Sequence, residues 1–168
     1  APLFVNCVFC DNSAAMSGGA VLMDDARPVI TNCTLYGNEA VETGGGLFAL
    51  NSRMNVNNCI LWNNGSPQIT TNTTDSIIRY CDVEELVEGT GNISENPRFV
   101  APDAGDFHLR ADSPCVNAGR NTSAVGFGSV TLDFDGDLRG ARYDIGVDEV
   151  LGGDVEGEDE GQGEGEGE

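Results

Sequence analysis

Four aspartates near the C-terminus have the spacing of oxygen ligands for a metal ion. Asp133, Asp135 and Asp137 occupy alternate positions, and Asp144 is the twelfth residue counted from Asp133. Calcium binds carboxylates at alternate positions of the twelve-residue EF-hand loop, in which the sixth residue is glycine. Here the sixth residue is Leu138. Two interpretations remain open, a calcium site or a turn held by a network of aspartates and arginines.

His108 is the single histidine of the chain and the first candidate for acid–base chemistry. Ser113 and Asp112 follow it closely, but a catalytic triad requires a geometry in space that adjacency along the chain does not provide. Hydrolases that use two carboxylates need a close pair. The nearest candidate, Asp24–Asp25, is not repeated, because Leu50–Asn51 occupies the equivalent positions of the next repeat. The sequence therefore predicts no catalytic residue.

Two cysteines have the spacing of half a zinc site. Cys7 and Cys10 form a C-x-x-C pair, and pairs of this kind supply thiolates to structural zinc sites. Residues three apart in a strand point to opposite faces, however, and no second C-x-x-C pair follows. We therefore expect thiols that pack as small apolar side chains.

Two aromatic residues and two arginines recur at one interval. Trp62 follows Tyr36 at the same spacing at which Arg53 follows Arg27. An exposed aromatic ring offers an apolar face on which a sugar can stack, and a guanidinium group pairs with carboxylates. If the rings point to solvent, these four residues predict a surface that binds carbohydrate.

This interval is the period of an internal repeat. It is 26 residues from Cys7 to Cys33 and again from Cys33 to Cys59. The segments 6–12, 32–38 and 58–64 all begin with Asn-Cys and end with Asn, and Gly18–Gly19 recurs as Gly44–Gly45. Helical repeats need apolar residues at a period of 3.6, which these segments lack. Short β-rich segments separated by turn residues, returning after one circuit, are typical of a parallel β-helix.

Stacked coils place equivalent residues above one another, so each repeated column predicts a ladder of side chains. The cysteine column should point inward as free thiols, because side-by-side neighbours in parallel strands have poor disulfide geometry. The asparagine columns should lie at corners, because asparagine tolerates left-handed backbone angles and can bond to the next coil. The predicted ladder residues are Cys7, Cys33, Cys59, Asn6, Asn32, Asn58, Asn12, Asn38 and Asn64.

The third repeat is predicted to be shorter than the others. Cys81 follows Cys59 at a smaller interval than the one that separates Cys59 from Cys33. Arg79 should therefore align with Asn57 and Thr31, and it does not extend the column of Arg27 and Arg53.

The charge of the chain excludes several classes of partner. The 168 residues carry 28 acidic and 8 basic side chains, a net charge of −20. Such a field repels phosphate backbones, so we expect no nucleic-acid binding, and no apolar run is long enough to insert into a membrane. Residues 152–168 hold 8 of the acidic residues in a Gly/Glu-rich run. We predict a disordered linker there that leads to a further domain or anchor.

The C-terminal motifs resemble those of bacterial right-handed parallel β-helix proteins that carry a choice-of-anchor Q domain. The resemblance rests on five motifs: Asn96-Pro97-x-Phe99-Val100, Asp106-Phe107-x-Leu109, Ser113-Pro114-x-x-x-Ala118-Gly119, Asp133-x-Asp135-Gly136-x-x-Arg139 and Asp144-Ile145-Gly146-x-x-Glu149. It covers nearly the whole chain up to Glu149, and it implies a pectate-lyase-like superhelix on a secreted or surface-attached protein. Asn117 departs from the pattern, which often has an acidic residue there.

Together these observations predict an all-β protein, a right-handed parallel β-helix of about four coils. Residues 1–96 should form the coils, residues 97–151 a C-terminal cap over the open end, and residues 152–168 the linker. The favoured function is non-enzymatic, a structural, adhesion or carbohydrate-binding scaffold at the bacterial cell surface with polysaccharide or cell-surface glycan as its partner. The alternative is a fragment of a polysaccharide lyase or glycoside hydrolase whose active site lies largely in upstream coils.

Overall fold

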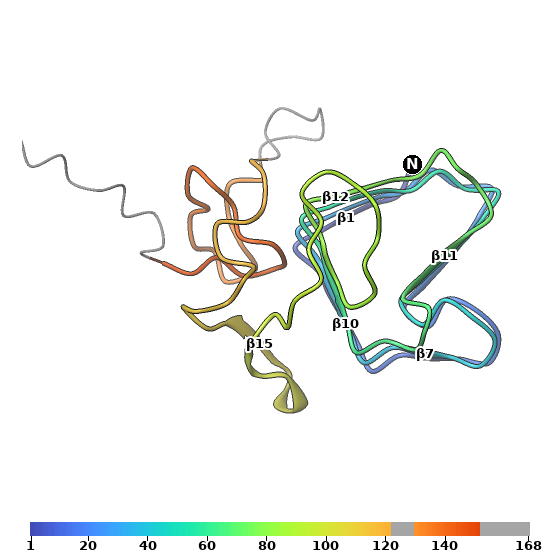
Figure 1. Cartoon of the computed structure of the whole chain (residues 1–168), viewed down its shortest axis with the longest axis horizontal. Coiled ribbons are helices and arrows are strands. Elements are labelled where there is room, and N and C mark those ends of the chain that lie inside the picture. The colour runs from blue at the N-terminus through green and yellow to red at the C-terminus, as the bar shows by residue number, and fades with distance from the viewer. Residues whose placement is uncertain (122–129, 152–168) are drawn as a thin grey trace, which may run out of the picture.

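Three parallel sheets wind around one interior in the computed structural model, which describes residues 1–121 and 130–151. Figure 1 looks along the winding axis, so that successive turns lie behind one another. The described residues contain strands and one short 3-10 helix, and none of their helices is long and apolar enough to cross a membrane. The fold is therefore the predicted all-β parallel solenoid. The predicted linker, residues 152–168, lies outside the described residues.

Each sheet takes one strand from each turn. The first sheet has the order β1-β5-β9-β12 and consists of Leu3–Val5, Val29–Thr31, Asn55–Asn57 and Ile77–Arg79. The second has the order β2-β6-β10-β13 and consists of Val8–Cys10, Thr34–Tyr36, Ile60–Trp62 and Asp82–Val83. The third, β4-β8-β11, consists of Val21–Asp24, Leu47–Leu50 and Ile69–Thr71, and the short pair β3 and β7 consists of Ser13–Ala14 and Glu39–Ala40. All of these strands pair in parallel, as the winding requires.

The strand register follows the sequence repeat. Thr31 pairs with Asn57 after one full period, and Asn57 pairs with Arg79 after the shorter interval. The shorter third repeat is therefore confirmed. Three complete turns form, and β12 and β13 begin a fourth, slightly fewer than the four coils expected.

The interior of the solenoid is a continuous apolar core. Leu35, Val56 and Leu61 are fully buried in it. The thiols of Cys33, Cys59 and Cys81 lie there too, with Cys7 packed against them, and all six cysteines of the chain are free. Each ladder thiol donates to the carbonyl oxygen two residues before it, as Cys59 Sγ does to Asn57 at 3.0 Å.

Asparagine shapes both corners around the second sheet, in two different ways. At the first corner Asn6, Asn32 and Asn58 have φ angles of 49°, 50° and 48°, in the left-handed region. At the second corner the left-handed residues are Asp11, Gly37 and Asn63. The left-handed position therefore precedes Asn12, Asn38 and Asn64 by one residue, whereas the predicted side-chain bonds between successive coils are confirmed.

The residue after the second corner turns inward, and its amide bonds to the next turn. Asn12 Nδ2 donates to Asn38 Oδ1 at 2.8 Å, and Asn38 Nδ2 donates to Asn64 Oδ1 at 2.7 Å. Asn64 Nδ2 ends the ladder on Gln68 Oε1 at 2.7 Å. The ladder gives buried polar groups a partner in each turn, which offsets the cost of their burial.

Residues 97–121 and 130–151, here the C-terminal module, lie beside the solenoid. The module begins with an antiparallel hairpin of β14 (Phe99–Ala101), η1 (Pro102–Ala104) and β15 (Asp106–Leu109). In Figure 1 its yellow-to-red trace stands next to the second sheet and away from the winding axis. Its apolar side chains pack on outward-facing residues of β2, β6 and β10. The predicted cap is thus a lateral module, and its place over the open end is a wrong expectation.

The loop after β13 covers the end of the last turn instead. Val87 packs against the interior core, and Ile93 forms a parallel bridge with Asp82. Asn92 Oδ1 accepts the Cys81 N–H at 3.0 Å. The backbone of this loop therefore satisfies part of the strand edge that would otherwise remain open.

Candidate functional site

The predicted aromatic platform is covered by the C-terminal module. Tyr36 and Trp62 point away from the interior of the solenoid, as their position in the strands requires. The ring of Tyr36 then packs edge-on against Phe99, with centroids 5.9 Å apart, and tilted against Phe107 at 5.5 Å. Trp62 is half-buried against the same cluster, which includes the buried side chain of Ile60. The expectation of an open carbohydrate platform is wrong, because these rings form a second core.

The two arginines of the predicted platform stay at the surface. Arg27 and Arg53 precede β5 and β9 of the first sheet, whereas the aromatic rings end strands of the second sheet. Arg53 forms an ion pair with Asp75, and both side chains are about half exposed. The four residues therefore do not make a single binding surface.

Asp133, the first aspartate of the predicted calcium loop, binds backbone groups. Asp133 Oδ1 accepts the N–H groups of Asp135, Gly136 and Asp137 at 2.8 to 3.0 Å, and its Oδ2 accepts that of Glu149 at 3.1 Å. These bonds tie residues 133–137 into a tight turn. A carboxylate with four backbone donors has little capacity left for a metal ion.

Asp144, the fourth member of that set, is engaged elsewhere. Its two oxygens accept the N–H groups of Asn117 at 2.7 Å and Val150 at 2.8 Å. Burial raises the pKa of Asp144 to about 6. Within residues 1–121 and 130–151, the one group of three or more potential metal ligands does not include Asp133, Asp137 or Asp144. The EF-hand-like arrangement is therefore wrong.

A buried arginine holds the module together, in line with the second interpretation of this region. Arg139 has no exposed side-chain surface, and its Nη1 lies 3.2 Å from Oε2 of Glu149. Its Nη2 donates to the carbonyl oxygens of Val147 at 2.8 Å and Gly146 at 3.1 Å. Desolvation lowers the pKa of Arg139, against the opposing effect of the nearby carboxylates. The planar guanidinium thus binds residues 146–149 through several contacts at once, which a lysine could not do.

His108 lies between two carboxylates. Its Nδ1 is 2.6 Å from Asp106 Oδ1, and its Nε2 is 2.7 Å from Asp135 Oδ2. The hydrogen bond to Asp106 is the main cause that raises the pKa of His108 to about 9, against a smaller opposing effect of burial. Asp148 completes a group in which one ligand atom from each of His108, Asp135 and Asp148 lies within 4.8 Å of the others.

Among the residues that the structure describes, the histidine has no serine partner. Ser113 Oγ donates to the Pro97 carbonyl oxygen at 2.6 Å, and Asp112 pairs with Arg98 at 3.0 Å. In the sequence His108 and Asp135 belong to separate patterns, and Asp148 belongs to no candidate set. Asp148 comes much later in the chain than His108, and no spacing rule connects two such positions.

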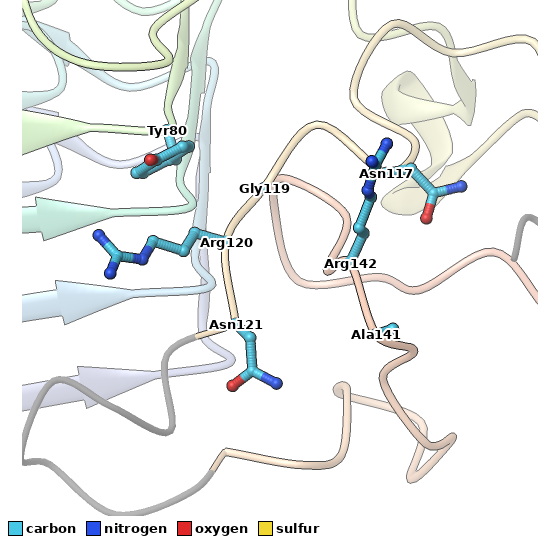
Figure 2. Close-up of a pocket in the computed structure, with 7 residues that line it drawn as sticks. All are labelled: Tyr80, Asn117, Gly119, Arg120, Asn121, Ala141 and Arg142. Atoms are coloured by element: carbon cyan, nitrogen blue, oxygen red, sulfur yellow. The ribbon is translucent and has the colours of Figure 1, made fainter.

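A surface pocket of about 420 Å³ opens where the C-terminal module meets the last turn of the solenoid. Figure 2 shows Tyr80 on the solenoid side, Arg120 extending toward it, and Arg142 on the opposite wall. The guanidinium carbon of Arg120 lies 5.9 Å from the centre of the Tyr80 ring, within the range of a cation–π contact. No sequence pattern indicates this pocket, because its residues come from segments that meet only when the module docks.

Comparison with known proteins identifies the family. A protein-family profile described as the right handed beta helix region matches residues 2–98, more than half of the chain. No curated protein and no solved structure matches the sequence. The profile covers the three turns and the closing loop, the part of the chain that forms parallel strands. The chain therefore belongs to the family of proteins with a right-handed β-helix.

Proposed function

We propose that this chain is part of a secreted or cell-surface β-helix protein and serves as a non-enzymatic scaffold that binds carbohydrate. The pocket between Tyr80, Arg120 and Arg142 is the observation that carries the proposal. It combines an aromatic side chain with two guanidinium groups, which donate hydrogen bonds to hydroxyl and carboxylate oxygens. Ligand sites of this kind are concave and contain a few directed polar groups.

The charge of the molecule also favours this pocket as a binding site. Arg120 and Arg142 are two of only 8 basic residues in a chain of net charge −20. Both side chains are exposed at the rim of the pocket. A polysaccharide or cell-surface glycan that carries acidic groups would meet repulsion over most of the surface and attraction here.

Three buried acidic groups of the module support a role without chemistry. Asp133, Asp144 and Glu149 bind backbone N–H groups or Arg139, and they hold the module in shape. Groups that are committed to fixed hydrogen bonds are poorly placed to exchange protons with a substrate. An extracellular, bacterial location and a further domain or anchor beyond residue 151 rest on the resemblance to choice-of-anchor Q proteins.

A glycan array tests the proposal directly. The whole chain should bind one or more acidic glycans, and the double variant Arg120→Ala/Arg142→Ala should lose most of that binding. The variant Arg27→Ala/Arg53→Ala is the matched control, because it removes the same charge from positions just before strands of the first sheet and should bind as the unchanged protein does.

Three results would contradict the proposal. Absence of binding to any glycan would make the protein an inert spacer, and equal loss in both double variants would show a purely electrostatic effect. New reducing ends or unsaturated products from uronate-containing polysaccharides would establish the alternative, a hydrolase or a lyase.

A further inference from the structure

The cluster around His108 contains the residue types of a metal site, and neighbouring groups hold these residues in place. We propose that His108 Nε2 and the carboxylates of Asp135 and Asp148 bind a divalent transition-metal ion of the Zn²⁺ type. This site shares Asp135 with the predicted calcium loop but none of that loop's other aspartates, and it is separate from the carbohydrate pocket. It does not rest on the proposed function.

Three segments of the C-terminal module supply the ligands. His108 lies on β15, Asp135 in the turn that follows Asp133, and Asp148 near the end of the described chain. One ligand atom from each lies within 4.8 Å of the other two. A zinc ion with bonds of about 2.0 to 2.2 Å to nitrogen and oxygen fits among atoms at such separations after small side-chain shifts.

The imidazole ring is already oriented for metal binding. Asp106 Oδ1 lies 2.6 Å from His108 Nδ1, so that this nitrogen carries its hydrogen toward Asp106 and Nε2 faces Asp135. Histidine ligands of metals almost always donate their other N–H to a carboxylate or a carbonyl group. The ring is therefore fixed in the orientation in which a metal would replace the proton shared with Asp135.

The Asp148 carboxylate and the main chain of Asp135 are also held in place. Leu109 donates its N–H to Asp148 Oδ2 at 2.7 Å, and Asp133 Oδ1 accepts the Asp135 N–H at 3.0 Å. Preorganised ligands lose little conformational entropy when a metal binds. Both restraints therefore favour binding at this place over the loose acidic surface elsewhere.

Asp148 provides an independent reason for a cation at this point. This residue is only 5% exposed, and among the described residues it has no ion pair within 4.0 Å. Burying a carboxylate away from a counter-ion costs free energy. Asp106 and Asp135 contact the same histidine, so three carboxylates surround one imidazole. A divalent ion would neutralise this excess negative charge.

The ligand set determines the class of metal. One imidazole nitrogen and two carboxylate oxygens suit zinc and its neighbours in the transition series, whereas calcium takes six to eight oxygens. The side chains of His108 and Asp135 are 47% and 43% exposed. The ion would therefore be reached from solvent and would retain water in its remaining coordination positions.

Nuclear magnetic resonance of the single histidine tests the site, since its ring signals need no further assignment. Zn²⁺ is added to the metal-free whole chain while the ¹⁵N shifts of both ring nitrogens are followed. One equivalent should move the Nε2 signal to the position of a metal-bound nitrogen and leave Nδ1 protonated. Calorimetry of the same titration should show one strong site above any weak binding.

Variants of the carboxylates separate this site from the acidic C-terminal segment. Asp148→Asn and the more exposed Asp135→Asn should each weaken Zn²⁺ binding more than about tenfold, because each removes a direct ligand. Loss of a residue that only supports a ligand already lowers metal affinity by about 10- to 100-fold. Asp137→Asn, an exposed residue of the same turn, is the control and should bind normally. If Nε2 does not respond to excess Zn²⁺, or if Asp135→Asn binds like the unchanged protein, the proposal is wrong. Such results would assign His108 to an ion-paired clamp between β15 and the turn.

Discussion

Buried amide and acidic side chains differ in how well their hydrogen-bond partners offset the free-energy cost of burial. Asn38 lies within a ladder in which its amide both donates and accepts, with partners in the turns on either side. Asp82 is fully buried and accepts one backbone N–H from Glu95 at 3.1 Å and the thiol of Cys115 at 3.2 Å. Neither contact supplies a positive charge. Asp82 is therefore a residue at which protonation and folding are coupled.

Asp82→Asn should stabilise the protein at neutral pH. Desolvation raises the pKa of Asp82 to about 6, whereas an aspartate in an unfolded chain titrates near pH 4. Between these values the folded state binds more protons, so the free energy of unfolding falls as pH rises through about 6. At pH 7 the ionised carboxylate costs up to about 3 kcal/mol, and the neutral amide avoids that cost while it keeps an acceptor for Glu95.

Urea unfolding of both proteins between pH 4 and pH 8 measures this difference. The advantage of Asp82→Asn should be largest above pH 7 and should shrink toward pH 4. Asp103→Asn, at an exposed position of the hairpin, controls for the loss of one negative charge. A difference that does not change with pH would contradict the prediction.

At the scale of single residues, the sequence predicted backbone conformations that depend on one residue and its position in the repeat. The left-handed angles of Asn6, Asn32 and Asn58 follow from a property of asparagine and from its place at a corner. The partners of His108 and Asp133 could not be predicted in this way. Their contacts depend on how irregular segments of the module fold against one another, and no periodic pattern describes such segments.

The winding of the solenoid depends on glycines where successive turns approach most closely. Gly45 donates its N–H to the Gly65 carbonyl oxygen at 3.0 Å. A Cβ atom at Gly45 would lie against the backbone of Gly65, and one at Gly19 would lie against the backbone of Gly45. At this column the backbone itself fills the space that side chains occupy elsewhere.

Gly45→Ala should destabilise the protein by at least about 2 kcal/mol, because rigid backbone has to move to admit the methyl group. Gly65→Ala is the matched control. Its Cβ would lie 3.5 Å from the Gly45 Cα, an ordinary contact, and we expect a change within about 1 kcal/mol. Urea midpoints of the two variants measure the contrast, and similar values for both would show that the turns can separate to admit a side chain.

At the scale of elements the repeat was highly informative. The repeat period and the shortened third interval predicted the register of β5, β9 and β12 because a solenoid pairs each strand with its own copy. The second sheet also carries a sequence signal for a covered outer face. Val8, Tyr36 and Trp62 are outward-facing yet apolar or aromatic, and a parallel sheet with apolar residues on both faces is covered on both sides.

At the scale of the whole molecule, the described residues form two cores that share the second sheet. One fills the solenoid, and the other lies between that sheet and the C-terminal module. The sequence-based expectation placed the module over the open end, because an exposed edge requires a cover. The structure meets that requirement with the loop that carries Val87, which leaves the module free to cover the side.

Phe107→Ala should loosen the module without unwinding the solenoid. Phe107 is 3% exposed and contacts the rings of Tyr36 and Phe99. Removal of such a ring costs about 3 to 5 kcal/mol. Amide hydrogen exchange should therefore become faster in residues 97–121 and 130–151, while β5 and β9 keep their protection.

Val100→Ala is the control for this prediction, because Val100 lies on the same hairpin and is 52% exposed. It should leave exchange in the module unchanged. Equal acceleration in β5, β9 and the module after Phe107→Ala would show that the two cores unfold as one unit.

The lateral position of the module has a mechanical consequence. The module bonds to the first turn through Asn6 and Leu132 at 2.7 Å, to the second through Thr34 and Val147 at 3.4 Å, and to the third through Asn58. Without the module, a tensile force along the winding axis would separate the turns one after another. With the module attached across three turns, the same force must shear contacts with all of them together, so the load is shared and the rupture force rises.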